Sequence, residues 1–300
     1  MNTAKAASLT MRRTRSTDLS SRARRGIVSA VSDPLRGFDP RATYDAASAD
    51  YEDASRDFWQ YMSTRTVELA ALRPGDTAID VACGNGPGLL AASRGVGPGG
   101  RVIGIDFATQ MLDIAEERIR AAGVENVELR TGDMTALDIA PGSVDALLCV
   151  LGVFFVDDMP GLLRSFWSLM RPGGRMAITV LGERFFDPMI DVFVDAVHAE
   201  RPGFDIVQPW RRIGDAAAFR ALAEEAGLTG FTLREDMDTL TLDNPDDWWR
   251  IVMGSGLRRT AEALGDDTAA KVRARCGQVM QERGVREVDL TSQYLLATRG

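Results

Sequence analysis

The sequence predicts an α/β protein: a doubly wound, seven-stranded, mostly parallel sheet with helices on both faces and helical lid insertions. The main observation is that short apolar runs alternate with helical segments from about residue 66 onward, which is typical of consecutive βαβ units. The second observation is composition. In a chain of 300 residues, 45% hydrophobic and 26% charged side chains provide enough apolar material for one large domain or two small ones.

Each predicted strand is a short apolar run bounded by turn residues or by a helical segment. The seven runs span residues 77–82, 101–105, 126–130, 144–150, 175–181, 231–234 and 289–298. Runs of this length and composition indicate strands in a buried sheet.

Three predicted connecting helices have recognisable signals. In the first, residues 108–122, one face carries apolar side chains; these are Met111, Leu112, Ala115 and Ile119. In the second, Asp158 is the expected N-cap, Pro160 lies in the first turn, and residues 171–174 end the helix. The third helix spans residues 215–226.

Two segments are longer than ordinary connections. The insertions span about residues 183–214, after the fifth strand, and 236–287, between the sixth and seventh strands. Insertions of this length usually cover or shape a site, so we expect both to form a helical lid.

Charge and composition exclude several classes of function. The net charge of -8 repels polyphosphate backbones and argues against a nucleic-acid partner. No apolar run is long enough for a membrane span, and the N-terminus lacks the apolar core of a secretory signal. Three distant cysteines and one histidine, His198, favour a cytoplasmic protein without disulfides or a metal site and make a Ser-His-Asp hydrolase improbable.

The N-terminal segment has a different composition from the rest of the chain. Residues 1–41 carry nine basic and three acidic side chains and are rich in Arg, Ser and Thr. We therefore predict a disordered basic arm over residues 1–37 and a single domain over residues 38–300. The arm is either a solvated tail without a function of its own, or a functional segment, namely a basic tether for an acidic partner or a processed leader.

A glycine-rich turn follows the first strand, and acidic residues follow the next two. Gly84, Gly86 and Gly88 allow a tight turn that exposes backbone N–H groups beside a helix N-terminus. Asp106 ends the second strand, where a carboxylate accepts hydrogen bonds from a ribose diol. Asp133 follows the third strand, where it can receive an adenine amino group. Three strand ends at one edge of a sheet therefore predict a site for a nucleotide-like ligand.

The glycine spacing distinguishes between cofactors. Dinucleotide-binding folds use G-x-G-x-x-G, whereas residues 83–88 read C-G-N-G-P-G. This run resembles the D-x-x-C-G-x-G-x-G motif of the class I S-adenosylmethionine-dependent methyltransferases, which have a Rossmann-like fold. The similarity is closest to the group that contains the ubiquinone/menaquinone-biosynthesis enzymes and many small-molecule methyltransferases. Residues 106–112, 169–174 and 44–52 also resemble motifs of that family.

The resemblance implies S-adenosyl-L-methionine as the cofactor and assigns residues to it. The implied cofactor-binding residues are Tyr51, Asp80, Ala82, Cys83, Gly84, Gly86, Asp106, Phe107, Met111, Gly132, Asp133, Met134 and Cys149. Alternatives stay open for some of them: Phe107 and Met111 also fit a helix core, Asp133 also fits a cap of the following turn, and Cys83 also fits a small packing residue.

The chain departs from the family pattern after the fourth strand. Many quinone-type relatives have a leucine-histidine pair there, but this chain reads V-L-G-V-F-F over residues 150–155. An assigned general base is therefore missing, and the catalytic residue is unknown. His198 and Asp157 are the weak candidates.

The resemblance implies methyl transfer to an O, N or C atom of a small, partly apolar acceptor. We expect Phe154, Phe185, Trp210 and Trp248 to contact that acceptor and Arg211 or Arg212 to pair with an acidic group on it. The alternative for these aromatic residues is that they only attach the insertions to the sheet. Two other functions stay open: a non-methyl reaction with the same cofactor (carboxypropyl transfer, or a pericyclic or hydrolytic step), and non-enzymatic cofactor binding.

Overall fold

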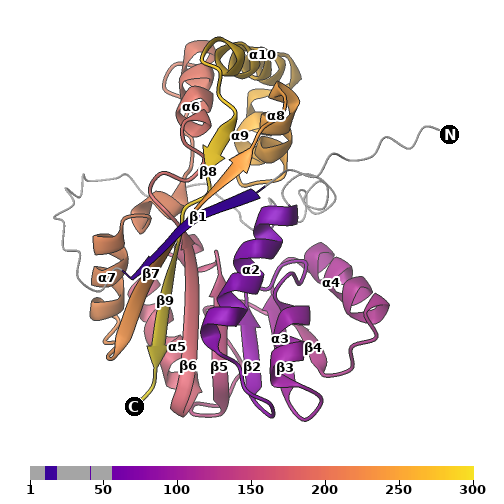
Figure 1. Ribbon diagram of the computed structural model, residues 1–300, viewed down its shortest axis with the longest axis vertical. Helices are drawn as coiled ribbons and strands as arrows, with labels where there is room; N and C mark the ends of the chain where they lie inside the picture. The colour runs from indigo at the N-terminus through magenta and orange to yellow at the C-terminus, as the bar shows by residue number, and fades with distance from the viewer. Residues whose placement is uncertain (1–10, 19–40, 42–55) are drawn as a thin grey trace.

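The computed structural model describes residues 11–18, 41 and 56–300. Its centre is a nine-stranded sheet in the order β1-β7-β9-β6-β5-β2-β3-β4, with β8 paired to β7 (Figure 1). The strands are β1 (Met11–Asp18), β2 (Thr77–Val81), β3 (Arg101–Asp106), β4 (Val127–Thr131), β5 (Val144–Val150), β6 (Met170–Leu181), β7 (Phe231–Thr241), β8 (Glu287–Asp289) and β9 (Ser292–Thr298).

The predicted fold class is confirmed. Strands β2 to β6 pair in parallel, whereas β9 runs antiparallel to both β6 and β7. All seven predicted strands are present, and β1 and β8 add to them. The strand order reverses direction at β2, so the carboxyl ends of β2 and its two neighbours form the crevice where such sheets bind ligands.

Helices cover both faces of the sheet, because alternate strand side chains supply two apolar surfaces. Helices α2 (Arg56–Ala70), α3 (Leu89–Val96) and α4 (Thr109–Ala121) contribute to a core cluster with Leu148 of β5. Helices α5 (Met159–Leu169) and α7 (Ala216–Glu225) pack with Leu147 on the other face. The Asp158 carboxylate accepts a hydrogen bond from Gly161 N and so caps α5 as predicted.

The two insertions form a helical cap at the carboxyl edge of the sheet. Four helices gather there, opposite the C-terminus of the chain (Figure 1). They are α6 (Met189–Glu200), α8 (Pro245–Met253), α9 (Arg258–Leu264) and α10 (Asp266–Glu282), and a short helical turn, η3 (Pro209–Arg212), follows α6. No helix in the described part of the chain has the length and hydrophobicity that crossing a membrane requires.

Two sequence predictions need correction here. Residues 11–18 of the expected disordered arm form β1, which pairs antiparallel with β7; residues 1–10 and 19–37 lie outside the described part. The second insertion begins after Thr241 rather than near residue 236, because β7 continues to that residue. Both differences have one physical cause, since β1 and the outer part of β7 are held by main-chain pairing that needs no apolar run.

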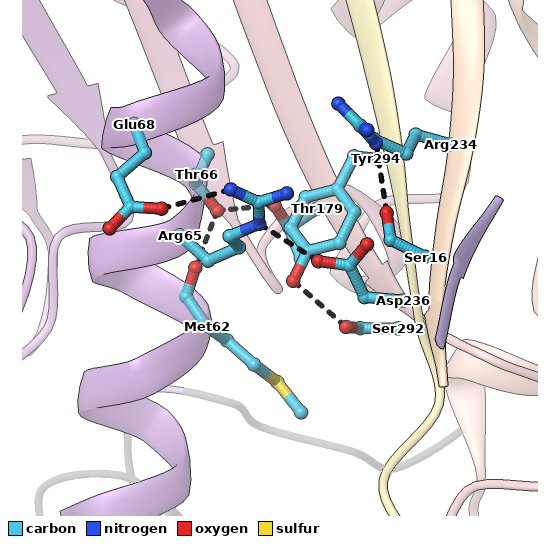
Figure 2. A network of polar contacts seen from close by, with 10 residues as sticks. All are labelled: Ser16, Met62, Arg65, Thr66, Glu68, Thr179, Arg234, Asp236, Ser292 and Tyr294. Carbon is cyan, nitrogen blue, oxygen red and sulfur yellow. Dashed lines mark hydrogen bonds and ion pairs between the residues drawn. The ribbon is translucent and has the colours of Figure 1, made fainter. Parts of the chain in front are cut away.

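Helix α2 is fixed to the sheet by polar contacts (Figure 2). Arg65 Nε donates to the buried Asp236 Oδ2 of β7 at 2.8 Å, and the Thr66 and Thr179 hydroxyls are hydrogen-bonded. Beside them, Arg234 Nε donates to Ser16 Oγ at 3.0 Å and so links β7 to β1. These bonds hold α2 over β5 and β6, where its N-terminal half reaches the crevice.

Candidate functional site

A single pocket extends across the carboxyl ends of four adjacent strands, β3, β2, β5 and β6. Helix α2 and loops of both insertions form its other walls. The residues at the β2 and β3 ends are partly polar, whereas those at the β5 and β6 ends are apolar. The pocket therefore has two halves of different chemistry.

The glycine loop after β2 is shaped by backbone geometry. Gly84 and Gly86 have φ of 54° and 80°, in the left-handed region that favours glycine. A Cβ at Gly86 would lie 3.1 Å from Ala115 Cβ of α4. Gly84 lines the pocket. At Gly86, the absence of a side chain lets α4 pack closely against the loop.

Asp106 ends β3 with its carboxylate directed at the glycine loop. It is 7% exposed; its Oδ2 accepts from Gly84 N at 2.8 Å, and its Oδ1 accepts from Ala108 N at 2.9 Å. The two backbone bonds hold the carboxylate in one orientation at the pocket wall.

Asp80 is a buried acid of the site whose ionisation is perturbed. The side chain is 2% exposed, and its Oδ1 is buried without a hydrogen-bond partner in the described part of the chain. Burial, and then the nearby Asp106, raise the pKa of Asp80 to about 7. A buried carboxylate with one oxygen unpartnered in the described part of the chain is suited to receive a cationic group from a ligand.

The thiols of the site are not activated. Burial, and then Asp106 and Asp80, raise the pKa of Cys83 well above its usual value. Burial, and then Asp80, raise the pKa of Cys149 to about 12. Both side chains are therefore neutral packing groups at neutral pH.

Most of the predicted cofactor-binding residues line the pocket. Those that do are Asp80, Ala82, Cys83, Gly84, Asp106, Phe107, Met111 and Met134. Gly86, Gly132, Asp133 and Cys149 lie near it without lining it, and Tyr51 is outside the described residues. The structure therefore brings eight of the predicted residues together around one cavity.

Three of the residues that do not line the pocket have clear structural roles. Asp133 is exposed, and its Oδ1 accepts from Thr135 N at 2.8 Å, so it caps the turn after β4. Gly132 N donates to Asp106 O at 2.9 Å. Cys149 is buried beneath the loop that follows β5.

The predicted acceptor-binding residues divide into two groups. Phe154 and Trp210 line the pocket as expected. Phe185 and Trp248 are each 1% exposed and do not, which corrects the prediction. Both belong to an aromatic cluster in which Phe186, between them, faces the pocket instead. The physical reason is packing, since large aromatic rings bury most area between the cap and the sheet.

The weak catalytic candidates lie away from the pocket. His198 is exposed on α6, with its Nε2 3.0 Å from Phe204 O. Asp157 is exposed as well, and its backbone carbonyl accepts from Arg212 Nη2 at 3.1 Å. Neither side chain lines the pocket.

Sequence reasoning missed two walls of the pocket. Trp59 and Ser63 come from α2, which precedes the first predicted element, and Ser255 to Leu257 come from the loop between α8 and α9. The Trp59 Nε1 donates to Gly254 O at 3.3 Å and so joins these two walls. The available signals were an apolar helical face in residues 58–67 and the G-S-G run at 254–256.

Three non-glycine residues of the pocket wall have left-handed backbone conformations. They are Ala82, Leu151 and Phe186, with φ of 59°, 60° and 70°. A Cβ on the neighbouring Gly152 would lie 2.8 Å from Cys149 Sγ and 2.9 Å from Ala82 Cβ. The loops after β2 and β5 therefore touch where only glycine fits, and strained backbone gathers at this cavity.

Comparisons with known proteins agree with this geometry. Residues 78–174 match a family model described as a methyltransferase domain. Nocamycin O-methyltransferase of Saccharothrix syringae is 31% identical over 136 residues, which cover 45% of this chain and 49% of that protein. Demethylmenaquinone methyltransferase of Bacillus cytotoxicus is 32% identical over 111 residues, 37% of this chain and 47% of that protein.

The solved structures extend the similarity to the fold. The YcgJ protein of Bacillus subtilis has a TM-score of 0.55 at 17% identity, covering 80% of this chain and 98% of that one. The chain spans about half the length of the curated relatives that it matches. The predicted resemblance to S-adenosylmethionine-dependent methyltransferases is therefore confirmed.

Proposed function

We propose that this chain, whose residues 78–174 match a methyltransferase-domain family model, transfers a methyl group from S-adenosyl-L-methionine to a small, partly apolar molecule. The acceptor atom is O, N or C. The observation that carries this proposal is that two acids in different environments, Asp106 and Asp80, flank one glycine loop. The orientation of the Asp106 carboxylate suits a diol, and the buried carboxylate of Asp80 suits a cationic group.

The residues present fit this cofactor. The unpartnered Asp80 Oδ1 matches the ammonium of the methionyl part, and the oriented Asp106 carboxylate matches the ribose hydroxyls. Phe107, Met111 and Met134 supply apolar surface for the adenine. Tyr51, Gly132, Asp133 and Cys149 stay predictions as cofactor contacts.

When bound, S-adenosyl-L-methionine supplies an electrophilic methyl group on a positively charged sulfur. The chain's own contribution is to orient and to exclude water. The loops after β2 and β5 meet at Ala82 and Gly152, between the two halves of the pocket, and so fix where the acceptor faces the cofactor. Alignment of reactants in a dry site provides about 7 to 11 kcal/mol of the barrier reduction.

No histidine or lysine lines the pocket in the described part of the chain. Orientation of the two reactants is therefore the main catalytic device. The non-methyl alternatives lack a specific observation in their favour. A cytoplasmic location and the absence of a nucleic-acid partner stay predictions.

Calorimetric titration of the full chain tests this proposal. We expect S-adenosylhomocysteine to bind in preference to NAD, and Asp106→Ala to weaken that binding by about 1.5 to 3 kcal/mol through loss of charged hydrogen bonds. Asp113→Ala, an exposed acid on α4, is the matched control and should bind normally. Equal or tighter binding of NAD would contradict the cofactor assignment.

A further inference from the structure

The half of the pocket at β5 and β6, which we call the acceptor half, has a uniform chemistry. It consists of the lining residues from α2, from the ends of β5 and β6 and from the two insertions, and its main surfaces are Trp59, Leu151, Phe154, Phe186, Trp210 and Leu257. In the described part of the chain, none of its lining residues is ionisable at neutral pH. The two acids of the pocket both belong to the other half.

Two hydroxyl groups lie in the described acceptor half, those of Ser63 on α2 and Ser255 in the second insertion, and the Ser255 hydroxyl is already engaged. Ser255 Oγ donates to Val252 O at 3.3 Å, and it accepts from Leu257 N at 3.3 Å. Trp59 Nε1 is occupied by Gly254 O. These polar atoms hold the wall together.

The nearest arginines of the first insertion are committed to other partners. Arg212 donates to Val156 O and Asp157 O at 2.9 Å and 3.1 Å. Arg211 contacts Gln208 and lies 3.8 Å from Asp191 Oδ1. Neither lines the pocket, so the expected pairing with an acidic group on the acceptor is not supported.

A charged acceptor would lose its hydration in this half without gaining a partner, and such burial is strongly unfavourable. The aromatic walls are also rigid. Trp59 packs with Phe58, at 4.3 Å between ring centroids, and with Phe185, at 6.3 Å. Flat apolar surface fits such walls best.

We infer that the acceptor half selects an uncharged molecule with a flat, apolar body and excludes carboxylates, phosphates and ammonium compounds. The inference rests on the proposed function, because it takes this half to be the place of the acceptor. It names the substrate class that the site favours. On this inference, the lack of charged side chains in the described acceptor half determines which acceptors bind.

Three probes that share one ring system test the inference by equilibrium dialysis with the full chain at pH 7. They are 2-naphthol (uncharged), 2-naphthoate (anionic) and 2-naphthylmethylammonium (cationic), each with and without saturating S-adenosylhomocysteine. We expect 2-naphthol to bind at least tenfold more tightly than both charged probes. Equal or tighter binding of either charged probe, or no binding of 2-naphthol at millimolar concentration, would overturn the inference.

A charge placed on the wall sharpens the test. Val207 is half-buried and lines the pocket, so Val207→Arg should increase 2-naphthoate affinity at least tenfold, while Val207→Leu keeps the original order. Phe155→Arg, on the opposite loop, serves if Val207→Arg does not fold. Unchanged 2-naphthoate affinity in a folded arginine variant would contradict the placement of this half.

The two proposals fail in different ways. If S-adenosylhomocysteine does not bind but 2-naphthol keeps its preference, the methyltransferase proposal is wrong, although the wall has the inferred chemistry. If S-adenosylhomocysteine binds and a charged probe is preferred, the substrate class is wrong and the cofactor site stands.

Discussion

At the scale of single residues, the site depends on groups whose surroundings change their ordinary behaviour. Among the described residues, one carboxylate oxygen of Asp80 has no hydrogen-bond partner. Gly152 must be a glycine because of the close contacts around it rather than because of its backbone conformation. The sequence pointed to Asp106, because it ends a strand where a carboxylate accepts a ribose diol, and to Asp80, because it matches the acid of the family's glycine motif. It did not predict Gly152, since the contact joins loops from separate strands.

Asp80 makes cofactor binding dependent on pH. Burial raises the pKa of Asp80 from 3.8 to about 7. Between these two pH values, the Asp80 carboxyl of the folded chain without ligand is therefore protonated. The unfolded chain ionises first, and the contribution of Asp80 to stability therefore falls as pH rises through this window. A cationic ligand group favours the ionised form.

We accordingly predict that S-adenosylhomocysteine binding near pH 6.5 releases a proton from Asp80. The heat of binding will depend on the ionisation enthalpy of the buffer, and Asp80→Asn will abolish that dependence and weaken affinity. Calorimetry in two buffers measures this. Identical heats in both buffers for the unaltered chain would show that Asp80 does not meet the ligand's charge.

Gly152→Ala tests the contact between the loops after β2 and β5. The added methyl group would lie 2.8 Å from Cys149 Sγ and 2.9 Å from Ala82 Cβ, and such overpacking costs about 1 to 3 kcal/mol of unfolding free energy. Gly99→Ala, where nothing lies within 4 Å, is the control. Urea denaturation compares the two, and equal stabilities would show that the loops part easily.

At the scale of elements, strands stabilised by buried side chains could be predicted from the sequence, whereas strands held by main-chain pairing could not. Most of the predicted strands lie where apolar runs occur, because burial of side chains stabilises them. The edge strand β4 is the exception, since its side chains are at most half-buried. Strand β1 is polar and arginine-rich, and main-chain pairing with β7 holds it. The side-chain pattern of such an edge strand does not indicate a strand, so the composition of this segment led to a prediction of disorder.

Strand β1 should contribute to stability. A chain that starts at Leu19 loses the pairing with β7 and the Arg234 to Ser16 hydrogen bond, and we expect its melting temperature to fall by about 5 °C, equivalent to about 1 to 2 kcal/mol. A chain that starts at Met11 keeps the strand and is the control. Equal melting temperatures for both would favour the original prediction of a disordered arm over a stabilising strand.

At the scale of the whole molecule, the pocket unites residues far apart in the sequence. The motif after β2 predicted the cofactor half because its residues are local. The acceptor half requires α2 to meet the loop after α8, as in the bond between Trp59 and Gly254. Such long-range assembly is set by packing of the cap, so Phe185 and Trp248 were assigned to the pocket although they form the core beneath it.

We propose that one pocket holds the cofactor at β2 and β3 and leaves the β5 and β6 side for the acceptor. A crystal structure of the chain with S-adenosylhomocysteine is the decisive measurement. We expect the ribose hydroxyls on Asp106, the amino group at Asp80 and the sulfur facing Leu151, with the acceptor half open. Density for S-adenosylhomocysteine outside this pocket, or with its adenosine in the half lined by Phe154 and Trp210, would contradict it.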